Sequence, residues 1–306
     1  MRYTISRSLT RVDSGFTIVE MVVVFSIVGV LLSLLIPAIQ AARESARQVS
    51  CRSNLHQIGV AVHSYHDTYG MCPPCCIWGG FDAGTEGFSW QSRLLPYLDQ
   101  GALYSKLQID RTFSPFTSYF NATGRPVPYG ETLVPVFRCP SSAIPSTSIQ
   151  MGSRDMDHVF AGYGTSDYKG SGGQSNFFGM FPVVTCGNTS VRFRDVTDGL
   201  SQCLMLGESS NPGREGRNIP IWIAQYGDAG RNTVFDSLYA INCVESFGGQ
   251  YWTSAISNDC ALSLHVGMCH FTFGDGAVRP LSENMDRSVY AFLGSISDGR
   301  AVGDSY

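Results

Sequence analysis

The feature that most constrains this chain is a long apolar stretch close to its N-terminus. After Glu20, no charged residue appears until Arg43, and the run from Met21 to Ile39 is predominantly apolar. A helix needs about 20 apolar residues to cross the hydrocarbon core of a bilayer, and residues 16–39 are enough. We therefore predict one membrane-spanning helix in this part of the chain.

One residue does not fit a plain membrane anchor. Glu20 lies inside the start of the apolar run, where a carboxylate is costly and usually has a partner or a function. The leader before it is short, polar and net positive, and it ends in Gly15 followed by Phe16. Near the other end of the run, Pro37 lacks the N–H that a helix interior requires, so we expect a local bend or loosening there.

The segment Gly15-Phe16-Thr17-Ile18-Val19-Glu20, followed by an apolar run, resembles the type IV prepilin signal of pilins and of type II secretion pseudopilins. The resemblance implies that a membrane-embedded prepilin peptidase cuts after Gly15 and that the new N-terminal Phe16 is N-methylated. It also implies that Glu20 pairs with the N-terminus of a neighbouring subunit in a filament. That pairing is chemically reasonable, because a carboxylate in hydrocarbon needs a cation.

Two other interpretations of this stretch stay open at the level of sequence. A cleavable secretory signal also starts positive, but its apolar core is typically ~7–15 residues and the candidate small-residue site here, Ala41-Ala42, is weak. An unprocessed anchor explains the length of the run but not the Gly-Phe pair followed by a lone Glu. Because Arg43 and Arg47 follow the span, charge does not settle its orientation.

Composition indicates what the rest of the chain can be. Charged residues make up 15% of the 306 residues, below the ~25% of average domains, and there are 33 glycines. This profile is typical of a turn-rich, extracytoplasmic β domain. The net charge of -4 and the lack of a basic run argue against a nucleic-acid surface.

The chain has ten cysteines, and an even count in an exported chain predicts disulfides. The sequence leaves the pairing open. The candidates are Cys51, Cys72, Cys75, Cys76, Cys139, Cys243 and Cys260.

The apolar pattern predicts that the membrane helix continues into the head. An apolar stripe recurs at helical spacing, at Leu55, Ile58, Val62 and Tyr65. A helix over 16–66 would be about 75 Å long at 1.5 Å per residue, and Gly70 would help to end it. We therefore predict a pilin-like α+β fold, with a leader at 1–15, the long helix at 16–66 and an antiparallel β-rich head at 67–306.

Within the head, four local predictions are made. The spacing of leucines predicts a short helix over 92–107, with Pro96 inside it. The run 203–206 predicts a buried strand. The segment 170–174 is a flexible loop by composition. Finally, Asp275-Gly276 after the alternating run 268–273 predicts a hairpin whose two central residues both have positive φ.

His265 lies ten residues before Asp275, and Gly276 follows. This spacing resembles the C-terminal signature of a large group of bacterial prepilin-like proteins, the processing-associated H-X9-DG group, whose central domain has no settled function. Other stretches resemble the same group in order along the chain. They are 53–59, 63–67, Phe137-Arg138-Cys139-Pro140-Ser141, 195–201 and Gly207-Glu208. The cysteine cluster at 71–76 departs from the group's pattern.

Few residues suggest catalysis or metal binding. His265 and Asp275 form an acid–base pair only if they meet, and an extended strand between them would hold them apart. His56, His63 and His66 lie along one side of the helix, and His63 and His66 with Cys72 and Cys75 have zinc-like spacing. We favour packing for the histidines and a disulfide for the cysteine cluster, because exported cysteines are more often oxidised.

We therefore predict a structural subunit, not an enzyme, without cofactor or metal. It would be processed after Gly15, methylated at Phe16 and assembled into a type IV pilus or a type II secretion pseudopilus. Its partners would be the prepilin peptidase, other pilin or pseudopilin subunits and inner-membrane assembly machinery. It would be a single-pass inner-membrane protein with an extracytoplasmic head. The alternative is an anchored surface protein whose head binds a glycan or another extracellular ligand without polymerising.

Overall fold

The fold comes from a computed structural model of the chain. The structure describes residues 17–75, 87–109, 127–148, 162–174, 178–182, 190–210, 220–225, 233–243 and 260–300. The chain divides into two compact units, 1–46 and 47–306. Each unit is described by itself.

The first unit contains the start of helix α1 (Ile18–Tyr69), which runs without interruption through Pro37. Among the described residues, α1 is the one helix that is long and apolar enough to cross a bilayer. This confirms the long N-terminal helix of the sequence prediction, with its end three residues later than expected. The helix ends at Gly70, whose φ is +70° and whose N–H bonds the carbonyl of His66 at 2.7 Å, as is common where a glycine follows a helix.

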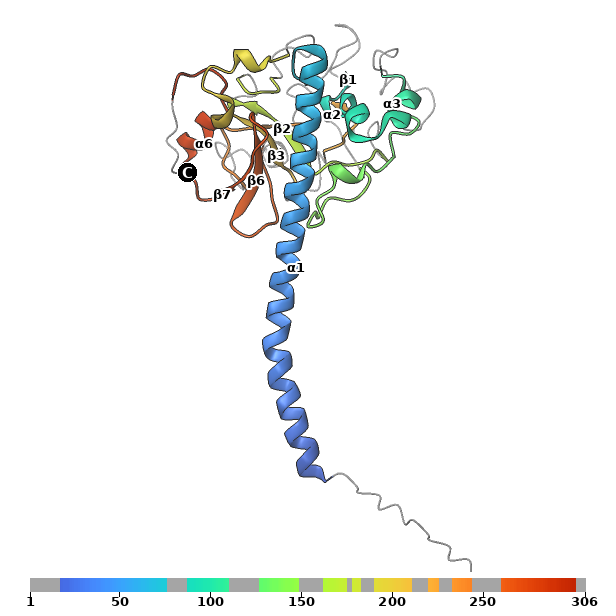
Figure 1. The fold of residues 1–306 in the computed structure, drawn as a ribbon, viewed down its shortest axis with the longest axis vertical. Helices are drawn as coiled ribbons and strands as arrows, with labels where there is room; N and C mark the ends of the chain where they lie inside the picture. Colours follow the sequence, from blue (N-terminus) through green and yellow to red (C-terminus); the bar gives the residue numbers. More distant parts are fainter. Residues whose placement is uncertain are drawn as a thin grey trace, which may run out of the picture. The chain divides into compact units, whose positions relative to one another are not determined.

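The second unit is built on a five-stranded sheet (Figure 1), with the strand order β5-β2-β3-β6-β7. Its strands are β2 (Tyr168–Gly173), β3 (Leu204–Glu208), β5 (Val234–Asp236), β6 (Met268–Phe273) and β7 (Val278–Ser282). Neighbouring strands are antiparallel except β2 and β5, which are parallel. The sheet is therefore mixed, not purely antiparallel as expected. The long connection between β2 and β5, which includes β3, allows the crossover that a parallel pair requires.

Smaller elements surround the sheet. They are β1 (Gly87–Phe88), which pairs with β4 (Ala224–Gln225), the 3-10 turns η2 (Pro135–Phe137), η4 (Phe193–Asp195) and η5 (Leu200–Gln202), and helix α6 (Arg287–Leu293). The single helix predicted over 92–107 is instead three short pieces, α2 (Trp90–Arg93), η1 (Leu95–Leu98) and α3 (Gly101–Leu107). Pro96 lies at the start of η1, and Asp99 with φ +58° separates η1 from α3. A proline and a left-handed residue are both poorly tolerated inside a helix.

The part of α1 that belongs to the second unit packs on the sheet. Its buried residues include the predicted stripe: Leu55, Ile58, Val62 and Tyr65. Gly59 sets the close approach, because a Cβ there would lie 2.9 Å from Cγ2 of Thr272 on β6. The Thr272 hydroxyl donates a hydrogen bond to the Leu55 carbonyl at 3.3 Å. The pilin-like arrangement of a long helix on a sheet is therefore confirmed.

The glycine-rich segment 170–174 is not the flexible loop that its composition suggested. Residues 168–173 form β2, which is buried along its whole length. Glycine is required because a Cβ on Gly170 would lie 2.7 Å from the ring of Phe181. Gly170 allows close packing against Phe181, so the prediction of a flexible loop, which rested on composition, was wrong.

The C-terminal hairpin is confirmed, with a different turn. β6 and β7 pair in register from Met268 opposite Ser282 to Thr272 opposite Val278. Only Gly276 has positive φ, at +84°, and its N–H donates to the Phe273 carbonyl at 2.9 Å. This pattern is a type I turn followed by a left-handed glycine, so Asp275 does not need the positive φ that a two-residue type I′ turn would impose.

Candidate functional site

The first turn of α1 holds Glu20 in a capping box with Thr17. The Thr17 hydroxyl accepts a hydrogen bond from the Glu20 N–H at 3.3 Å. A Glu20 carboxylate oxygen accepts in return from the Thr17 N–H and hydroxyl, each at 2.8 Å. Such reciprocal bonds satisfy N–H groups that a helix start leaves unpaired. The carboxylate therefore reaches back to the residue after Phe16, while Gly15 and Phe16 themselves lie outside the described residues.

Between residues 18 and 39, none of the residues of α1 is buried, and apart from Glu20 this part of the helix is uncharged and predominantly apolar on all sides. Ile18 is 83% exposed and Leu34 is 68% exposed. A helix that is apolar all round is stable only in an apolar environment, which a bilayer or a bundle of similar helices provides. The segment is therefore suited to a membrane, to a filament core, or to both in turn.

In the head, a disulfide joins α1 to the loop after η2. It links Cys51 and Cys139, which are separated by 88 residues and have their Cα atoms 5.2 Å apart. A second disulfide links Cys243 and Cys260. The prediction of disulfides in the head is confirmed, and the structure supplies the pairing that the sequence left open.

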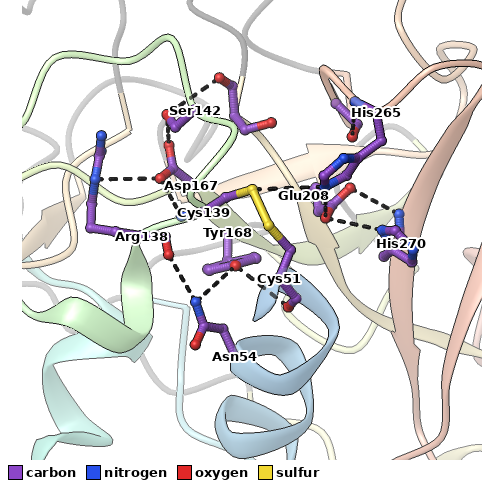
Figure 2. The surroundings of a disulfide bond; sticks show 12 residues. Cys51, Asn54, Arg138, Cys139, Ser142, Asp167, Tyr168, Glu208, His265 and His270 are labelled. Atoms are coloured by element: carbon purple, nitrogen blue, oxygen red, sulfur yellow. Dashed lines mark hydrogen bonds and ion pairs between the residues drawn. A yellow bond between two sulfur atoms is a disulfide. The ribbon is translucent and has the colours of Figure 1, made fainter. Parts of the chain in front are cut away.

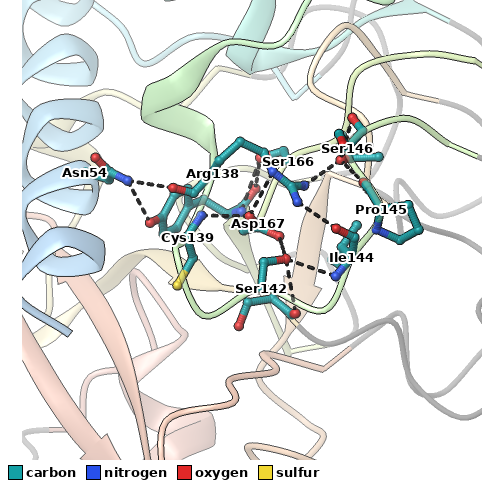
Figure 3. A network of polar contacts seen from close by, with 12 residues as sticks. Asn54, Arg138, Cys139, Ser142, Ile144, Pro145, Ser146, Ser166 and Asp167 are labelled. Carbon is teal, nitrogen blue, oxygen red and sulfur yellow. Dashed lines mark hydrogen bonds and ion pairs between the residues drawn. The ribbon is translucent and has the colours of Figure 1, made fainter. Parts of the chain in front are cut away.

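Polar contacts around Cys139 hold the same loop against α1 and β2 (Figure 3). The Asn54 side-chain amide donates to the Arg138 carbonyl at 2.8 Å and to the Tyr168 hydroxyl at 3.3 Å. The buried Asp167 carboxylate accepts from the Cys139 N–H at 2.7 Å and lies 3.4 Å from the Arg138 guanidinium. Burial raises the pKa of Asp167 to about 6, although Arg138 acts in the opposite direction.

Beside the disulfide, one carboxylate lies between two histidines (Figure 2). Glu208 on β3 has one carboxylate oxygen 3.4 Å from Nε2 of His265 and 3.2 Å from Nδ1 of His270. Its other oxygen accepts from the His270 N–H at 3.0 Å. All three side chains are buried. Burial alone would raise the pKa of Glu208, but hydrogen bonds from the two histidines outweigh it and hold the pKa at about 2.

The structure does not bring His265 and Asp275 together as a dyad. His265 is buried before β6 and lies 3.8 Å from the Cys139 sulfur. Asp275 is in the turn after β6, where its carboxylate accepts from the Ala277 N–H and contacts the Arg279 guanidinium at 3.4 Å. A Cβ on Gly276 would lie 3.6 Å from His63 Nε2, so this glycine fits under α1. The two signature residues therefore lie at opposite ends of β6: His265 precedes the strand, and Asp275 lies in the turn that follows it.

The histidines on α1 do not form the zinc site considered from spacing. His66 stacks on Phe193 with ring centroids 3.9 Å apart, and His63 packs against the same ring at 4.7 Å. His56 is exposed on α1. These contacts agree with the packing interpretation.

The cysteine cluster also differs from its favoured interpretation. Cys72 and Cys75 are buried thiols, not disulfide partners, and Cys76 lies outside the described residues. The Cys72 N–H bonds the Val191 carbonyl, while the Cys75 sulfur lies 3.9 Å from the Thr233 hydroxyl. The two cysteines therefore lie in different surroundings. Burial raises the pKa of the Cys72 thiol to about 12, so it is a poor nucleophile.

A surface hollow of about 310 Å³ lies at the C-terminal end of α1. Its lining residues are His66, Tyr69, Gly70, Met71, Arg192 and Arg194. It combines an aromatic side chain with two guanidinium groups, a chemistry suited to an anionic ligand.

Sequence reasoning missed the central role of Glu208. It noted Gly207-Glu208 and His265 as separate motif residues, 57 positions apart along the chain, and tested His265 only against Asp275. The cue was Gly207. A Cβ there would lie 2.7 Å from the Phe271 ring, so this glycine marks the close approach of β3 to β6 that brings the carboxylate to the histidines.

Comparison with known families agrees with this geometry. Residues 10–36 match the prokaryotic N-terminal methylation motif, so the chain is a prepilin-like protein whose motif implies processing by prepilin peptidase and membrane anchoring. Residues 40–288 match the family described as protein of unknown function (DUF1559), and because this match covers most of the chain, the chain belongs to that family. Comparison with curated proteins and with solved structures gave no match.

Proposed function

We propose that this protein is a structural subunit that is cleaved after Gly15, N-methylated at Phe16 and assembled through α1 into a type IV pilus or a type II secretion pseudopilus. The observation that carries the proposal is the methylation motif on a helix that leaves every residue from 18 to 39 unburied. Before assembly, the lipid of the bilayer would cover this apolar surface, and after assembly the same helix of neighbouring subunits would cover it. The head then lies on the extracytoplasmic side of the inner membrane.

Glu20 has the chemistry to direct this assembly. Its carboxylate already accepts the Thr17 N–H, so it lies where the positive end of the helix dipole favours an anion. A methylated α-amino group at Phe16 of a second subunit would supply the full positive charge that a carboxylate in hydrocarbon needs. The role is structural, and the proposal includes no catalytic step. Inner-membrane assembly machinery would supply the energy for insertion into the filament.

The test is mass spectrometry and N-terminal sequencing of the full chain from membranes of its native host, followed by crosslinking in intact cells. The expected chain starts at N-methylated Phe16 and gives ladders of crosslinked subunits. A chain that starts at Met1 would contradict processing, and a processed chain that never crosslinks to a pilin or pseudopilin would contradict assembly. Glu20→Ala should keep the cleavage and lose the ladders.

A second candidate function rests on the hollow at the end of α1. The two guanidinium groups of Arg192 and Arg194, beside Tyr69, favour an anchored protein whose head binds an acidic glycan. Saturable binding of an oligouronate to the full chain in detergent, lost in Arg192→Ala/Arg194→Ala, would support it. Binding that is unchanged by both substitutions, or absent, would contradict it.

A further inference from the structure

Four potential metal ligands from four separate segments meet inside the head. They are Cys51 on α1, Cys139 after η2, Glu208 on β3 and His265 before β6, and one ligand atom from each lies within 4.8 Å of all the others. All four residues are buried. Figure 2 shows the two sulfurs, the carboxylate and the imidazole converging on the same point. In the oxidised chain, the disulfide uses both sulfurs.

We propose that reduction of the Cys51–Cys139 disulfide converts this cluster into a tetrahedral site for one Zn²⁺ ion, with two thiolates, one imidazole and one carboxylate as ligands. Zinc prefers this mixture of sulfur, nitrogen and oxygen donors, at about 2.3 Å from sulfur and about 2.0–2.1 Å from nitrogen. Those bond lengths place tetrahedral ligands about 3.3–3.8 Å apart. Nε2 of His265 lies 3.4 Å from the Glu208 oxygen and 3.8 Å from the Cys139 sulfur.

The surroundings of Glu208 resemble those of a supported metal ligand. His270 contacts one carboxylate oxygen through Nδ1 at 3.2 Å and donates its N–H to the other at 3.0 Å. Contacts of this kind fix the orientation of a ligand before the metal arrives. His270 thus has a positioning role, and His265 remains the imidazole ligand.

The reaction balances with a dithiol as the reductant. The dithiol gives two electrons and two protons to the disulfide, becomes a disulfide itself and leaves thiols at Cys51 and Cys139. Binding of Zn²⁺ then releases both thiol protons to solvent as the sulfurs become thiolate ligands. In either state a cross-link joins α1 to the loop after η2, through a sulfur–sulfur bond when oxidised and through the metal when reduced, and the metal would also tie in Glu208 on β3.

The experiment uses the full chain in detergent under anaerobic conditions. The chain is reduced with a phosphine, which with one water becomes a phosphine oxide and yields the same two thiols, and is then titrated with Co²⁺ as a spectroscopic substitute for Zn²⁺. We expect one Co²⁺ per chain, an absorption band from thiolate-to-cobalt charge transfer, and loss of the band when Zn²⁺ is added. The oxidised chain is the control without substitutions and should show no band.

Three variants locate the site. Cys51→Ser/Cys139→Ser should abolish the band, while the matched control Cys243→Ser/Cys260→Ser should keep it. Glu208→Gln should weaken Co²⁺ binding at least tenfold, because a neutral amide is a much poorer ligand than a carboxylate.

Four results would overturn the proposal. They are a reduced wild-type chain without the band, a band that survives loss of Cys51 and Cys139, Co²⁺ affinity unchanged in Glu208→Gln, and loss of the near-ultraviolet circular dichroism of the folded head on reduction even with Zn²⁺ present. A band lost only in Cys72→Ser/Cys75→Ser would likewise place the metal elsewhere.

Discussion

The two parts of α1 share one continuous backbone and have opposite surroundings. Between residues 18 and 39, no side chain is buried within the chain, whereas from Cys51 to Tyr65 one side of the helix is buried against the sheet. Two glycines show the contrast: a Cβ on Gly29 would meet nothing within 4 Å, whereas one on Gly59 would meet Thr272 at 2.9 Å. Secondary structure alone thus does not tell what a helix is for.

The difference follows from the distribution of apolar residues. In the first part they surround the helix, so no face is distinguished and the helix needs an apolar medium. In the second part they recur on one face, which selects one partner, the sheet. Substitutions in the second part should therefore change the stability of the head, while substitutions in the first part should change insertion or assembly.

The largest expected effect on the head comes from removing the Cys51–Cys139 disulfide. Its closed loop of 88 residues predicts a loss of about 4–5 kcal/mol in the oxidised chain, against about 3 kcal/mol for the 17-residue separation of Cys243–Cys260. Urea unfolding of Cys51→Ser/Cys139→Ser and Cys243→Ser/Cys260→Ser, followed by tryptophan fluorescence in detergent, measures both. A larger loss in the second variant would refute the importance of the link between α1 and the loop after η2.

The next effect concerns pH. The folded chain holds the pKa of Glu208 at about 2, below its ordinary value of 4.5, so its contribution to stability is present above about pH 4.5 and is lost as the pH falls towards 2. The downward shift corresponds to roughly 3 kcal/mol.

Glu208→Gln should remove this dependence and lower stability at neutral pH. Chemical unfolding of the oxidised chain between pH 7 and pH 2.5 checks it. If wild type and Glu208→Gln lost the same amount of stability between pH 7 and pH 2.5, another titrating group would have to cause the loss at low pH.

The described structure divides clearly into what the sequence predicted and what it did not. The apolar stripe on α1, the strand around Cys203 and the C-terminal hairpin were predictable, because each depends on residues close together in sequence. Segment 170–174 was misinterpreted, because its glycines are explained by the Phe181 ring packed over β2, a contact that local composition does not report.

The cluster around Glu208 was beyond sequence reasoning for a related reason. Its members come from four segments that only the completed sheet brings together. Sequence reasoning weighed only Asp275 as a partner for His265 and argued against it, so Glu208 was not considered. The pairing of Cys51 with Cys139 was likewise one of many that ten cysteines allow.

A smaller change in the stability of the head is expected from substitution of Gly59 on α1, and none from substitution of Gly29 on the same helix. Gly59→Ala should destabilise the head by about 1–3 kcal/mol, because the methyl group must displace Thr272 in a tightly packed interface. Gly29→Ala should leave head unfolding unchanged, since nothing lies near it and alanine favours a helix. The same urea titration measures both variants. If both alanines were equally harmless, the close approach of α1 to β6 would not limit the packing.

The smallest expected effect on the head is that of Glu20. Glu20→Gln keeps a side chain able to accept the Thr17 N–H, so the start of α1 retains a capping interaction. Head unfolding should change by less than about 0.5 kcal/mol, because Glu20 is exposed and belongs to the unit 1–46, not to the head. Crosslinking of subunits in cells should nevertheless fall strongly, since the amide has no charge to offer a neighbouring N-terminus. A stable head with unimpaired crosslinking would show that the helix cap, not charge pairing, explains the carboxylate at position 20.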